Sequence, residues 1–390
     1  MKYKNLYIGT LSGTSADSID AALIEIKETI KVINSASLKL PNKIKKQILN
    51  LANEKKNLKK YPSKDLLNLD KEFALLNSKL INRLISKNES LRQSIKAIGS
   101  HGQTIQHFPF AKNPYTLQIG NPKIISEFTK IKTIANFREA NIRCGGIGAP
   151  LTPAFHKTFF YSKKENRVII NIGGITNITR LIPDLPIIGW DSGPGNCLID
   201  QCVQYFSNNE KQFDKNGELG QRGSNVLLEK AISHVLSQKY FKESLPKSQS
   251  IINFNFPDLY KKFDPSENIL KEDWISAVTE ITARSIVNDL NKFCNLKNLE
   301  IYFCGGGSKN NYLISRIKSQ INQNWKVMNT RKLGLDPMLV EACTFAWLGK
   351  MRLENKKIDL ENSTGAKPSK LGEIYSVSYT HLRAHETLLD

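Results

Sequence analysis

The chain has 390 residues and a mass of 44.0 kDa, and a single hydrophobic core usually stops growing at about 250 to 300 residues. We therefore expect two domains. A content of 40% hydrophobic and 24% charged residues is typical of a soluble globular protein. No apolar run approaches the roughly 18 residues that span a membrane, and the N-terminus has no long apolar leader, so we expect a cytoplasmic protein.

The net charge of +20 comes mostly from lysines scattered through segments that are also rich in Asn and Ile. No stripe of arginines interleaved with aromatic residues accompanies them, which argues against nucleic acid as the main partner. We interpret the charge as surface composition that also attracts anionic ligands such as ATP. Six cysteines without a CxxC pair indicate reduced, buried thiols.

In chain order, the first half predicts strands that alternate with helices and glycine-rich turns. The expected strands are residues 6–11, 21–26, 31–40, 95–99, 115–119 and 132–137, and the expected helices are residues 43–56, 63–86 and 122–130. The helix over 63–86 has leucines and a phenylalanine at spacings of three and four, which we interpret as core packing.

The second half restarts with the pattern of the first, after a helix that ends near residue 161. Its expected strands are residues 167–174, 177–182, 186–191 and 299–304, and its expected helices are residues 195–206, 225–239, 273–293, 311–321 and 337–353. This recurrence predicts a duplicated α/β unit rather than one long sheet.

We place an N-terminal domain at residues 1–135 plus about 355–375, and a C-terminal domain at residues 136–354. Residues 376–390 lose the Lys, Asn and Ile bias of the preceding chain, and His381 and His385 fall among them. We expect this tail to be non-native, so its HxxxH spacing does not mark a metal site.

Three glycine-rich turns lie beside strand-like runs, at Gly9–Asp20, Asn171–Asn177 and Gly305–Ser308. Glycines let the backbone approach phosphate closely, hydroxyl groups donate hydrogen bonds, and carboxylates can hold the Mg²⁺ that accompanies ATP. The first turn lacks the lysine of the P-loop motif. Taken alone, it is as well explained by a plain hairpin.

A fourth segment, Asp191–Asn196, follows an apolar run and places one carboxylate in a tight turn that opens a helix. We therefore expect phosphoryl transfer with Asp191 at the chemistry. Two hairpin loops in duplicated halves, plus a late strand with its glycine turn, are typical of the actin and hexokinase ATPase superfamily. The pattern predicts an α/β, two-domain, actin-like (ribonuclease H-like) ATPase fold with duplicated mixed sheets and ATP in an interdomain cleft.

A narrower resemblance extends in order from about Tyr7 to Tyr375. The segments that carry it are Leu11–Asp20, Ser100–Ile105, Thr116–Gly120, Gly145–His156, Asn171–Asn177, Trp190–Asn196 and Glu341-Ala342 before Phe345-Ala346-Trp347. In these segments the chain resembles the anhydro-N-acetylmuramic acid kinases.

The resemblance implies an ATP-dependent enzyme of cell-wall recycling. Such an enzyme opens the 1,6-anhydro bridge of anhydro-N-acetylmuramic acid with water and phosphorylates the released 6-oxygen, giving N-acetylmuramic acid 6-phosphate and ADP. Asp191 matches the catalytic Asp of the family, the general base that takes a proton from the attacking water.

The resemblance also implies a nucleotide site and a metal site. The nucleotide-binding positions are Gly13, Thr14, Ser15, Ala16, Asp17, Ser18, Ile19, Asp20, Gly173, Gly174, Gly305, Gly306 and Gly307. Asp17, Asp20 and Glu341 are the candidates for Mg²⁺, directly or through water, and the sequence does not rank them. A homodimer is the expected assembly.

His101 and Arg138 are the candidate sugar-binding residues. His101 follows a buried strand, and a guanidinium at Arg138 can grip the acidic lactyl group in a bidentate way. A surface arginine at a strand end explains Arg138 equally well. The chain departs from the family pattern in the expected sugar-side region. Ser18 replaces a usual glycine, Asn136 and Asn141 stand where acidic residues are common, and Ile147 replaces a usual glutamine.

His101, His107 and His156 do not have the spacing of a zinc site, and for His156 we favour a satisfied core or cap histidine. Two other functions fit the same superfamily. A nucleotide-gated binding protein would be expected to carry an added peptide-binding or polymerising segment, and none is visible. A nucleic-acid or carbamoyl-transfer protein would need a paired-histidine motif, which is also missing.

Overall fold

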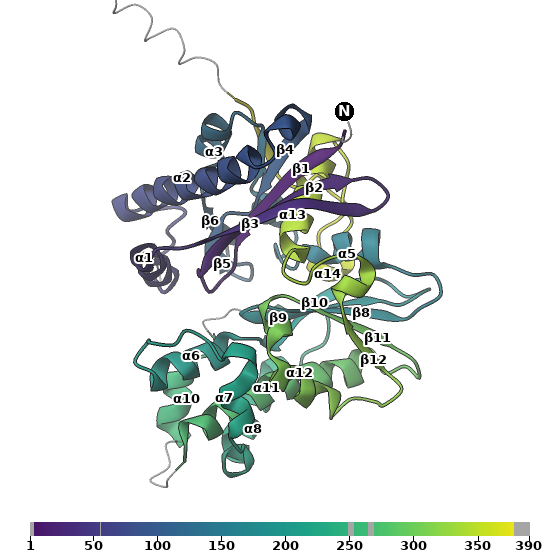
Figure 1. Ribbon diagram of the computed structural model, residues 1–390. Coiled ribbons are helices and arrows are strands. Elements are labelled where there is room, and N and C mark those ends of the chain that lie inside the picture. Colours follow the sequence, from purple (N-terminus) through teal and green to yellow (C-terminus); the bar gives the residue numbers. More distant parts are fainter. Residues whose placement is uncertain (1–3, 55, 249–252, 264–268, 378–390) are drawn as a thin grey trace, which may run out of the picture. The chain divides into compact units, whose positions relative to one another are not determined.

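The computed structural model describes residues 4–54, 56–248, 253–263 and 269–377. Its contacts divide the chain into two units (Figure 1). The first takes in the chain up to Gly148, Glu341–Asp359 and the chain from Ala366, and the second takes in Ala149–Val340 and Leu360–Gly365. No helix of the described residues is long and apolar enough to cross a membrane. The expected tail falls almost wholly on residues 378–390, outside the described residues.

These units differ from the expected domain boundaries in three places. Leu360–Gly365 was expected in the N-terminal domain and belongs to the second unit. The segment after residue 135 stays with the first unit, because α4 (Phe137–Arg143) contacts β6 (Tyr115–Ile119). The helix α13 (Val340–Leu353) also belongs almost wholly to the first unit, although the expectation gave it to the second.

The first unit is built on a six-stranded sheet of order β13-β7-β4-β1-β2-β3. Its strands are β1 Leu6–Ser12, β2 Ser18–Ile26, β3 Ile30–Lys39, β4 Ile95–Ser100, β7 Thr133–Ala135 and β13 Glu373–Tyr375. The strands β1 to β3 form an antiparallel meander, whereas β4 runs parallel to both β1 and β7. The helices are α1 Asn42–Ala52, α2 Lys64–Ser86, α3 Pro122–Thr129, α4 and α13.

The two faces of this sheet receive different helices because side chains alternate along a strand. Leu6 and Ile8 of β1 join the core formed with α2. On the opposite face, Gly9 and Gly99 lie under α13, where an added Cβ would come within 1.8 Å of the Ala342 carbonyl oxygen and 1.9 Å of the Phe345 carbonyl oxygen, respectively. Gly9 therefore serves helix packing inside β1 and is not part of the loop that follows.

A separate hairpin, β5 (Gln103–Phe108) with β6, was not fully expected, since only β6 has a clear apolar pattern. Gln103 and Gln106 are buried in β5 and interrupt that pattern. The side chain of Gln106 accepts a hydrogen bond from the Leu58 backbone N–H at 3.1 Å and donates to the Glu54 carbonyl at 2.8 Å. The Gln106 amide therefore holds the loop between α1 and α2.

The second unit repeats the strand order of the first, which confirms the duplicated actin-like fold. Its sheet has the order β10-β9-β8-β11-β12. The strands are β8 Arg167–Ile172, β9 Ile175–Leu181, β10 Ile188–Pro194, β11 Glu300–Cys304 and β12 Lys326–Asn329. As in the first unit, three antiparallel strands are followed by two that run parallel to the first of them.

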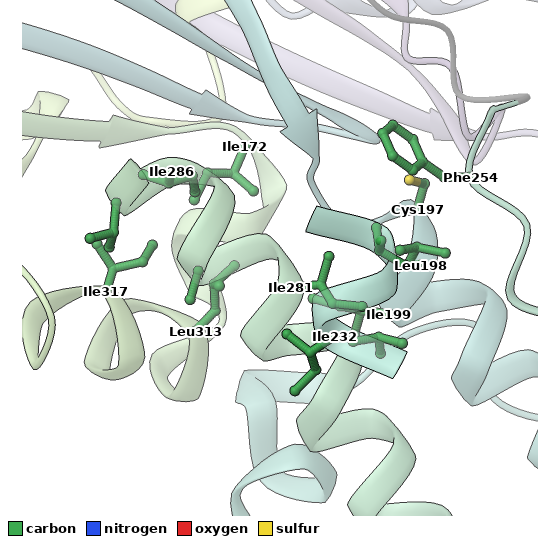
Figure 2. Close-up of a cluster of buried hydrophobic side chains, with 14 of the residues drawn as sticks. Ile172, Cys197, Leu198, Ile199, Ile232, Phe254, Ile281, Ile286, Leu313 and Ile317 are labelled. Atoms are coloured by element: carbon green, nitrogen blue, oxygen red, sulfur yellow. The ribbon is translucent and has the colours of Figure 1, made fainter. Parts of the chain in front are cut away.

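Several helices of the second unit pack against α11 (Lys271–Phe293). Besides α11, the α-helices of this unit are α5 Thr152–Phe160, α6 Cys197–Phe206, α7 Glu218–Arg222, α8 Glu229–Leu236, α9 Lys239–Lys242, α10 Phe256–Phe263, α12 Asn311–Lys318 and α14 Glu361–Thr364. Figure 2 shows Ile281 and Ile286 of α11 with Leu198 of α6 and Leu313 of α12 in one apolar core. Burial of these side chains fixes α11 beneath the sheet, where it can support the site described next.

Among the helices expected in the second half of the chain, one is interrupted and another begins later than expected. The helix expected over 225–239 is interrupted, since a 3₁₀ turn at Val226–Leu228 precedes α8 and a separate α9 follows it. The last long helix begins at Val340, so Pro337 lies before it and not in its first turn.

Candidate active site

Asp191 lies in β10 opposite Asn177 of β9, at an irregular point of the ladder. The register shifts between Asp191 and Gly193, so that β10 carries one extra residue there. A bulge of this kind bends a strand and re-aims its side chains, and bulges are common beside active sites. Gly193 permits the close approach of neighbouring groups, because an added Cβ would lie only 2.9 Å from Phe241 Cε1.

The Asp191 carboxylate is almost fully buried, with 4% of the residue exposed. Asn177 Nδ2 donates a short hydrogen bond to Oδ1, and Ser248 Oγ donates one of 2.8 Å to Oδ2. A buried carboxylate needs such partners, because desolvation without them would be very costly. The side chain therefore has a fixed orientation before any ligand arrives.

The backbone of Asp191 is held as well, by the segment from Tyr240 to Ser248. The Asp191 N–H donates to the Lys247 carbonyl at 3.1 Å, and the Tyr240 hydroxyl donates a short hydrogen bond to the Asp191 carbonyl. Burial, followed by the nearby Asp191 charge, raises the pKa of Tyr240, so this phenol stays a donor. No sequence motif marks Tyr240, Lys247 or Ser248, so the sequence alone does not predict their place beside Asp191.

The glycine-rich turns of the second unit meet at one edge of its sheet. The strands β8 and β11 are parallel, so their carboxyl ends reach the same edge, where nucleotide sites of α/β proteins lie. Gly195 N–H donates to the Gly174 carbonyl at 2.9 Å, which ties the turn after Asp191 to the β8–β9 loop. An added Cβ at Gly305 would lie 2.3 Å from Asn171 Oδ1, and one at Gly307 would lie 2.2 Å from Ile172 Cγ2.

The corresponding loop of the first unit, between β1 and β2, is more open. Gly13 and Thr14 are exposed, Ser15 is half-buried, and an added Cβ at Gly13 would meet no atom within 4 Å. Ala16 adopts the left-handed conformation with φ of 52°. The loop leaves β1 beside β5, since the Ser12 N–H donates to the Gly102 carbonyl at 3.2 Å.

The three candidate carboxylates for Mg²⁺ have different surroundings. Asp17 is exposed and pairs with Lys45 at 2.5 Å, whereas Asp20 is half-buried and accepts a 3.1 Å hydrogen bond from the Ser18 hydroxyl. Glu341 stands in the first turn of α13. Among the described residues, no group of three or more His, Cys, Asp or Glu side chains could hold a metal ion.

His101 and Arg138, both of the first unit, contact each other directly. Arg138 Nε donates to His101 Nε2 at 2.7 Å, and His101 Nδ1 lies 3.0 Å from the Gly102 carbonyl oxygen. Burial, with the added effect of the Arg138 charge, lowers the pKa of His101 to about 3. The imidazole is therefore neutral at physiological pH, with its proton on Nδ1, because Nε2 must accept the hydrogen bond.

His101 also lines a cavity of about 120 Å³ in the first unit. Polar side chains of Asp70, Gln118, Asn121 and Asn136 line it too. Four polar groups around so small a space suit a ligand that offers hydroxyl or amide groups. The role of His101 in sugar binding stays a prediction.

Two departures from the family pattern have structural explanations. Asn141 Oδ1 accepts a hydrogen bond from the Gly148 N–H at 2.8 Å, a role that an Asp carboxylate could fill equally well. Asn136, in the left-handed conformation with φ of 60°, donates to Glu373 Oε2 at 2.8 Å. An Asp at position 136 would place two carboxylates together, so the amide and Glu373 suit each other.

His156 and the cysteines partly follow expectation. His156 is buried, with Nδ1 2.9 Å from Thr179 Oγ1, but its Nε2 has no hydrogen-bond partner among the described residues, which leave it half satisfied. Burial lowers the pKa of His156 to about 3. All six cysteines are free thiols, and five are buried; Cys144 is exposed, contrary to expectation.

The duplicated sheet order, the two hairpin loops and the glycine turn after β11 define an α/β ATPase of the actin and hexokinase type. The family model of anhydro-N-acetylmuramic acid kinase matches residues 5–377. The chain therefore belongs to the anhydro-N-acetylmuramic acid kinase family.

Individual relatives agree with this assignment. The anhydro-N-acetylmuramic acid kinase of Coxiella burnetii is 39% identical, with 95% of this chain and 98% of that protein covered. The Pasteurella multocida protein of the same name is 37% identical over 95% of this chain and 96% of its own length. A solved structure, the activator of 2-hydroxyisocaproyl-CoA dehydratase from Clostridium difficile with bound ADPNP, matches 90% of this chain and 96% of its own at 12% identity and a TM-score of 0.43. The family assignment accordingly rests on the sequence matches.

Proposed function

We propose that this protein is an ATP-dependent kinase of peptidoglycan recycling, which hydrolytically opens the 1,6-anhydro ring of anhydro-N-acetylmuramic acid and phosphorylates O6. The products are N-acetylmuramic acid 6-phosphate and ADP. Family membership over nearly the whole chain supports the substrate. The observation that carries the chemistry is the buried Asp191 carboxylate, which two side-chain donors hold at a strand bulge.

In the proposed reaction Asp191 acts as the general base. A water molecule loses a proton to its carboxylate as the water oxygen bonds to C1 of the sugar. The C1–O6 bond breaks, O6 keeps the electron pair and bonds to the γ-phosphorus, and the bond to the β–γ bridging oxygen breaks to release ADP. The proton on Asp191 then passes to solvent. Asn177 and Ser248 hold the Asp191 carboxylate in position. This favours the reaction, because a base that is already in place does not have to reorganise.

We propose that ATP is bound by both hairpin loops and by the late glycine turn. These are Gly13–Asp20 in the first unit and Gly173, Gly174 and Gly305–Gly307 in the second. The meeting of the second unit's turns at the carboxyl edge of β8 and β11 supports this. The open loop at Gly13 supports it too, since a phosphate could contact the loop backbone without displacing a side chain.

Mg²⁺ would neutralise charge on the phosphates, and Asp17, Asp20 and Glu341 would hold it. Since the described residues contain no preformed three-ligand cluster, these carboxylates fit an ion that keeps several waters and is held largely by the nucleotide. Asp20 is the stronger candidate of the two in the loop, because Lys45 already neutralises Asp17.

His101 and Arg138 are proposed to bind the sugar. The cavity beside His101 supports this, and so does the neutral state of its imidazole, which can bond to hydroxyl groups without the cost of a buried charge. Arg138 supplies a cation near that cavity for the acidic lactyl group. We further propose a cytoplasmic homodimer whose ligands are small molecules and not nucleic acid.

An ATP-consumption assay tests the function. Purified protein is given anhydro-N-acetylmuramic acid, N-acetylmuramic acid or N-acetylglucosamine, and ADP and sugar phosphate are measured together. Equal amounts of ADP and N-acetylmuramic acid 6-phosphate from the anhydro sugar alone would support the proposal. ADP release that is independent of every sugar would indicate an ATPase with another role.

A further inference from the structure

A buried ion pair lies beside Asp191 in the second unit. Lys247 Nζ is 3.0 Å from Asp289 Oδ1, and the two side chains are only 1% and 4% exposed. Two charges withdrawn from water gain little net stability, and an apolar pair of similar size is often as stable. A pair at this depth is therefore better explained by a role in position than by a role in stability.

The pair is connected to the side chain of Trp190, the residue before Asp191, and to the backbone of Asp191 itself. Asp289 Oδ2 accepts a 2.9 Å hydrogen bond from Trp190 Nε1, and Trp190 directly precedes Asp191 in β10. The carbonyl of Lys247 accepts the 3.1 Å hydrogen bond from the Asp191 N–H. One ion pair thus joins α11, β10 and the segment that covers Asp191.

Two further contacts extend from Lys247 toward the carboxylate. Ser248, the next residue, donates to Asp191 Oδ2 at 2.8 Å. The ammonium of Lys247 also lies 4.9 Å from the centre of the Tyr240 ring, and the Tyr240 hydroxyl donates to the Asp191 carbonyl. A cation at this distance from an aromatic face is attracted to it. Three hydrogen bonds of Asp191 therefore involve Lys247, its neighbour Ser248 or the Tyr240 ring beside it.

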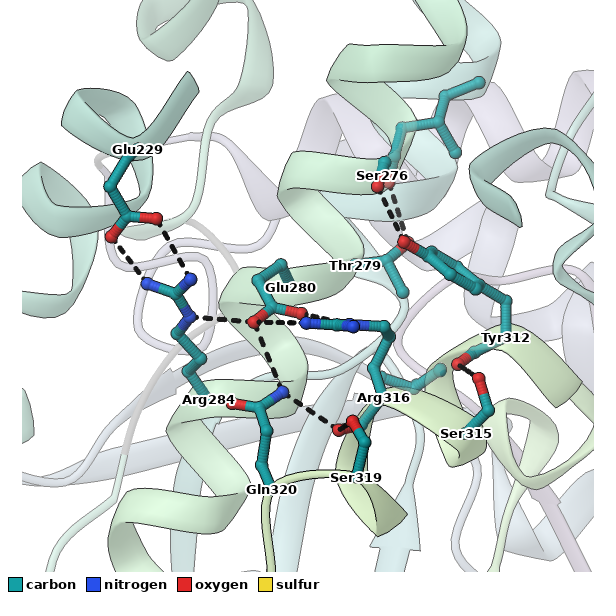
Figure 3. A network of polar contacts seen from close by, with 12 residues as sticks. Glu229, Ser276, Thr279, Glu280, Arg284, Tyr312, Ser315, Arg316, Ser319 and Gln320 are labelled. Carbon is teal, nitrogen blue, oxygen red and sulfur yellow. Dashed lines mark hydrogen bonds and ion pairs between the residues drawn. The ribbon is translucent and has the colours of Figure 1, made fainter. Parts of the chain in front are cut away.

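A second buried carboxylate on α11 provides a comparison. Glu280, whose side chain is 1% exposed, bonds to Arg284 and Arg316, and Arg284 continues to Glu229 of α8 (Figure 3). The two arginines are about one-third exposed. This network joins α8, α11 and α12 and makes no contact with Asp191 among the interactions described. Glu280 therefore matches Asp289 in its helix, its burial and its charge, but not in its position relative to Asp191.

We propose that Lys247 and Asp289 are positioning residues for the reaction, which fix the Asp191 carboxylate by clamping Trp190 and Lys247–Ser248 on its two sides. The inference rests on the proposed function of Asp191 as the base. Neither residue touches substrate in this scheme, so both act through Asp191. A base displaced by about 1 Å can lose about 100-fold in rate. The loops proposed to bind ATP consist of other residues. The pair should therefore govern kcat and leave the KM for ATP unchanged.

The test compares Asp289→Asn and Lys247→Met with the matched control Glu280→Gln. For each protein, kcat and the KM for ATP and for the anhydro sugar are measured together with the melting temperature. We expect kcat to fall about 10- to 100-fold in the first two variants, with the KM for ATP within about twofold. The control should lose thermal stability and keep kcat within about twofold.

A double variant, Lys247→Met with Asp289→Leu, keeps the test decisive if the single variants fold poorly, because an apolar pair can replace a buried ion pair without loss of stability. We expect it to fold and to remain slow. Wild-type kcat in the folded double variant would overturn the proposal, as would a kcat loss in Glu280→Gln equal to that of Asp289→Asn. A wild-type protein inactive on the anhydro sugar would instead contradict the proposed function, so the two failures are distinct.

Discussion

Asp191 and Asp17 both lie at hairpins of duplicated sheets, yet their surroundings are opposite. Asp191 is 4% exposed and receives side-chain hydrogen bonds from Asn177 and Ser248. The Asp17 side chain is 52% exposed and pairs with the flexible cation of Lys45. The buried carboxylate is preorganised for a chemical step, whereas the exposed one can change partners when a ligand arrives. The same topology therefore carries one fixed and one adaptable carboxylate.

The largest expected effect follows from Asp191→Asn, because an amide cannot accept the proton of the attacking water. We expect kcat on anhydro-N-acetylmuramic acid to fall about 100- to 10,000-fold, the usual contribution of a general base. Binding of an ATP analogue, measured by calorimetry, should remain nearly intact. The matched control is Asp184→Asn, an exposed carboxylate between β9 and β10 that should leave kcat unchanged. Near wild-type turnover in Asp191→Asn would rule out the base.

The next effect is a loss of stability in acid, which depends on the buried His101 and His156 and the half-buried His107. Burial is the main cause that lowers each pKa from 6.5 to about 3. Since the folded pKa lies below the unfolded one, their contribution to stability is complete above pH 6.5 and is lost as pH falls toward 3.

Urea unfolding at several pH values measures this loss. We expect the midpoint to fall steadily from pH 7 to pH 4. The slope should be shallower in His107→Asn, in which one of these titrating groups is missing. An unfolding midpoint that stays constant over this range would contradict the neutral state of these histidines, on which the proposed role of His101 in sugar binding depends.

A smaller effect, on stability, should distinguish a glycine packed under α13 from the glycine of the open loop. Gly99→Ala would place a Cβ 1.9 Å from the Phe345 carbonyl, so α13 must move, at a cost of about 1 to 3 kcal/mol. Gly13→Ala meets no atom within 4 Å and should leave the free energy of unfolding unchanged. If Gly13 approaches phosphate, the same variant should raise the KM for ATP. Equal stability losses in the two variants would remove this distinction.

The smallest effect is expected at the exposed carboxylate. Asp17→Asn removes a surface ion pair, which is worth at most about 1 kcal/mol. Any change in the KM for Mg²⁺-bound ATP would then report on metal binding, and Asp20→Asn should raise that KM more than Asp17→Asn. Glu89→Gln, which removes another exposed pair with Arg92, is the control. A larger effect at Asp17 than at Asp20 would reverse the ranking proposed here.

Several features could be predicted from residues near one another in the chain. Glycines beside apolar runs located the loops at Gly13 and Gly173, and the recurrence of three strands predicted the duplication that both sheet orders confirm. The helix soon after Asp191 was also evident, because α6 follows β10 closely, but Asp191 lies within β10 and not in the expected turn. Buried glutamines concealed β5, since a strand that buries polar side chains lacks the alternation that predicts strands.

The sequence by itself determined the family, the doubled sheet and the candidate base, because all three depend on local spacing and on motifs in a fixed order. Only the tertiary structure decided what holds that base. Lys247 and Asp289 lie 42 residues apart, and neither belongs to a motif. Their pairing, and the contact of both with the strand that carries Asp191, depend on how α11 packs beneath the sheet. The packing of an apolar core brings distant residues together, and no local pattern in the chain encodes which charged side chains it will enclose.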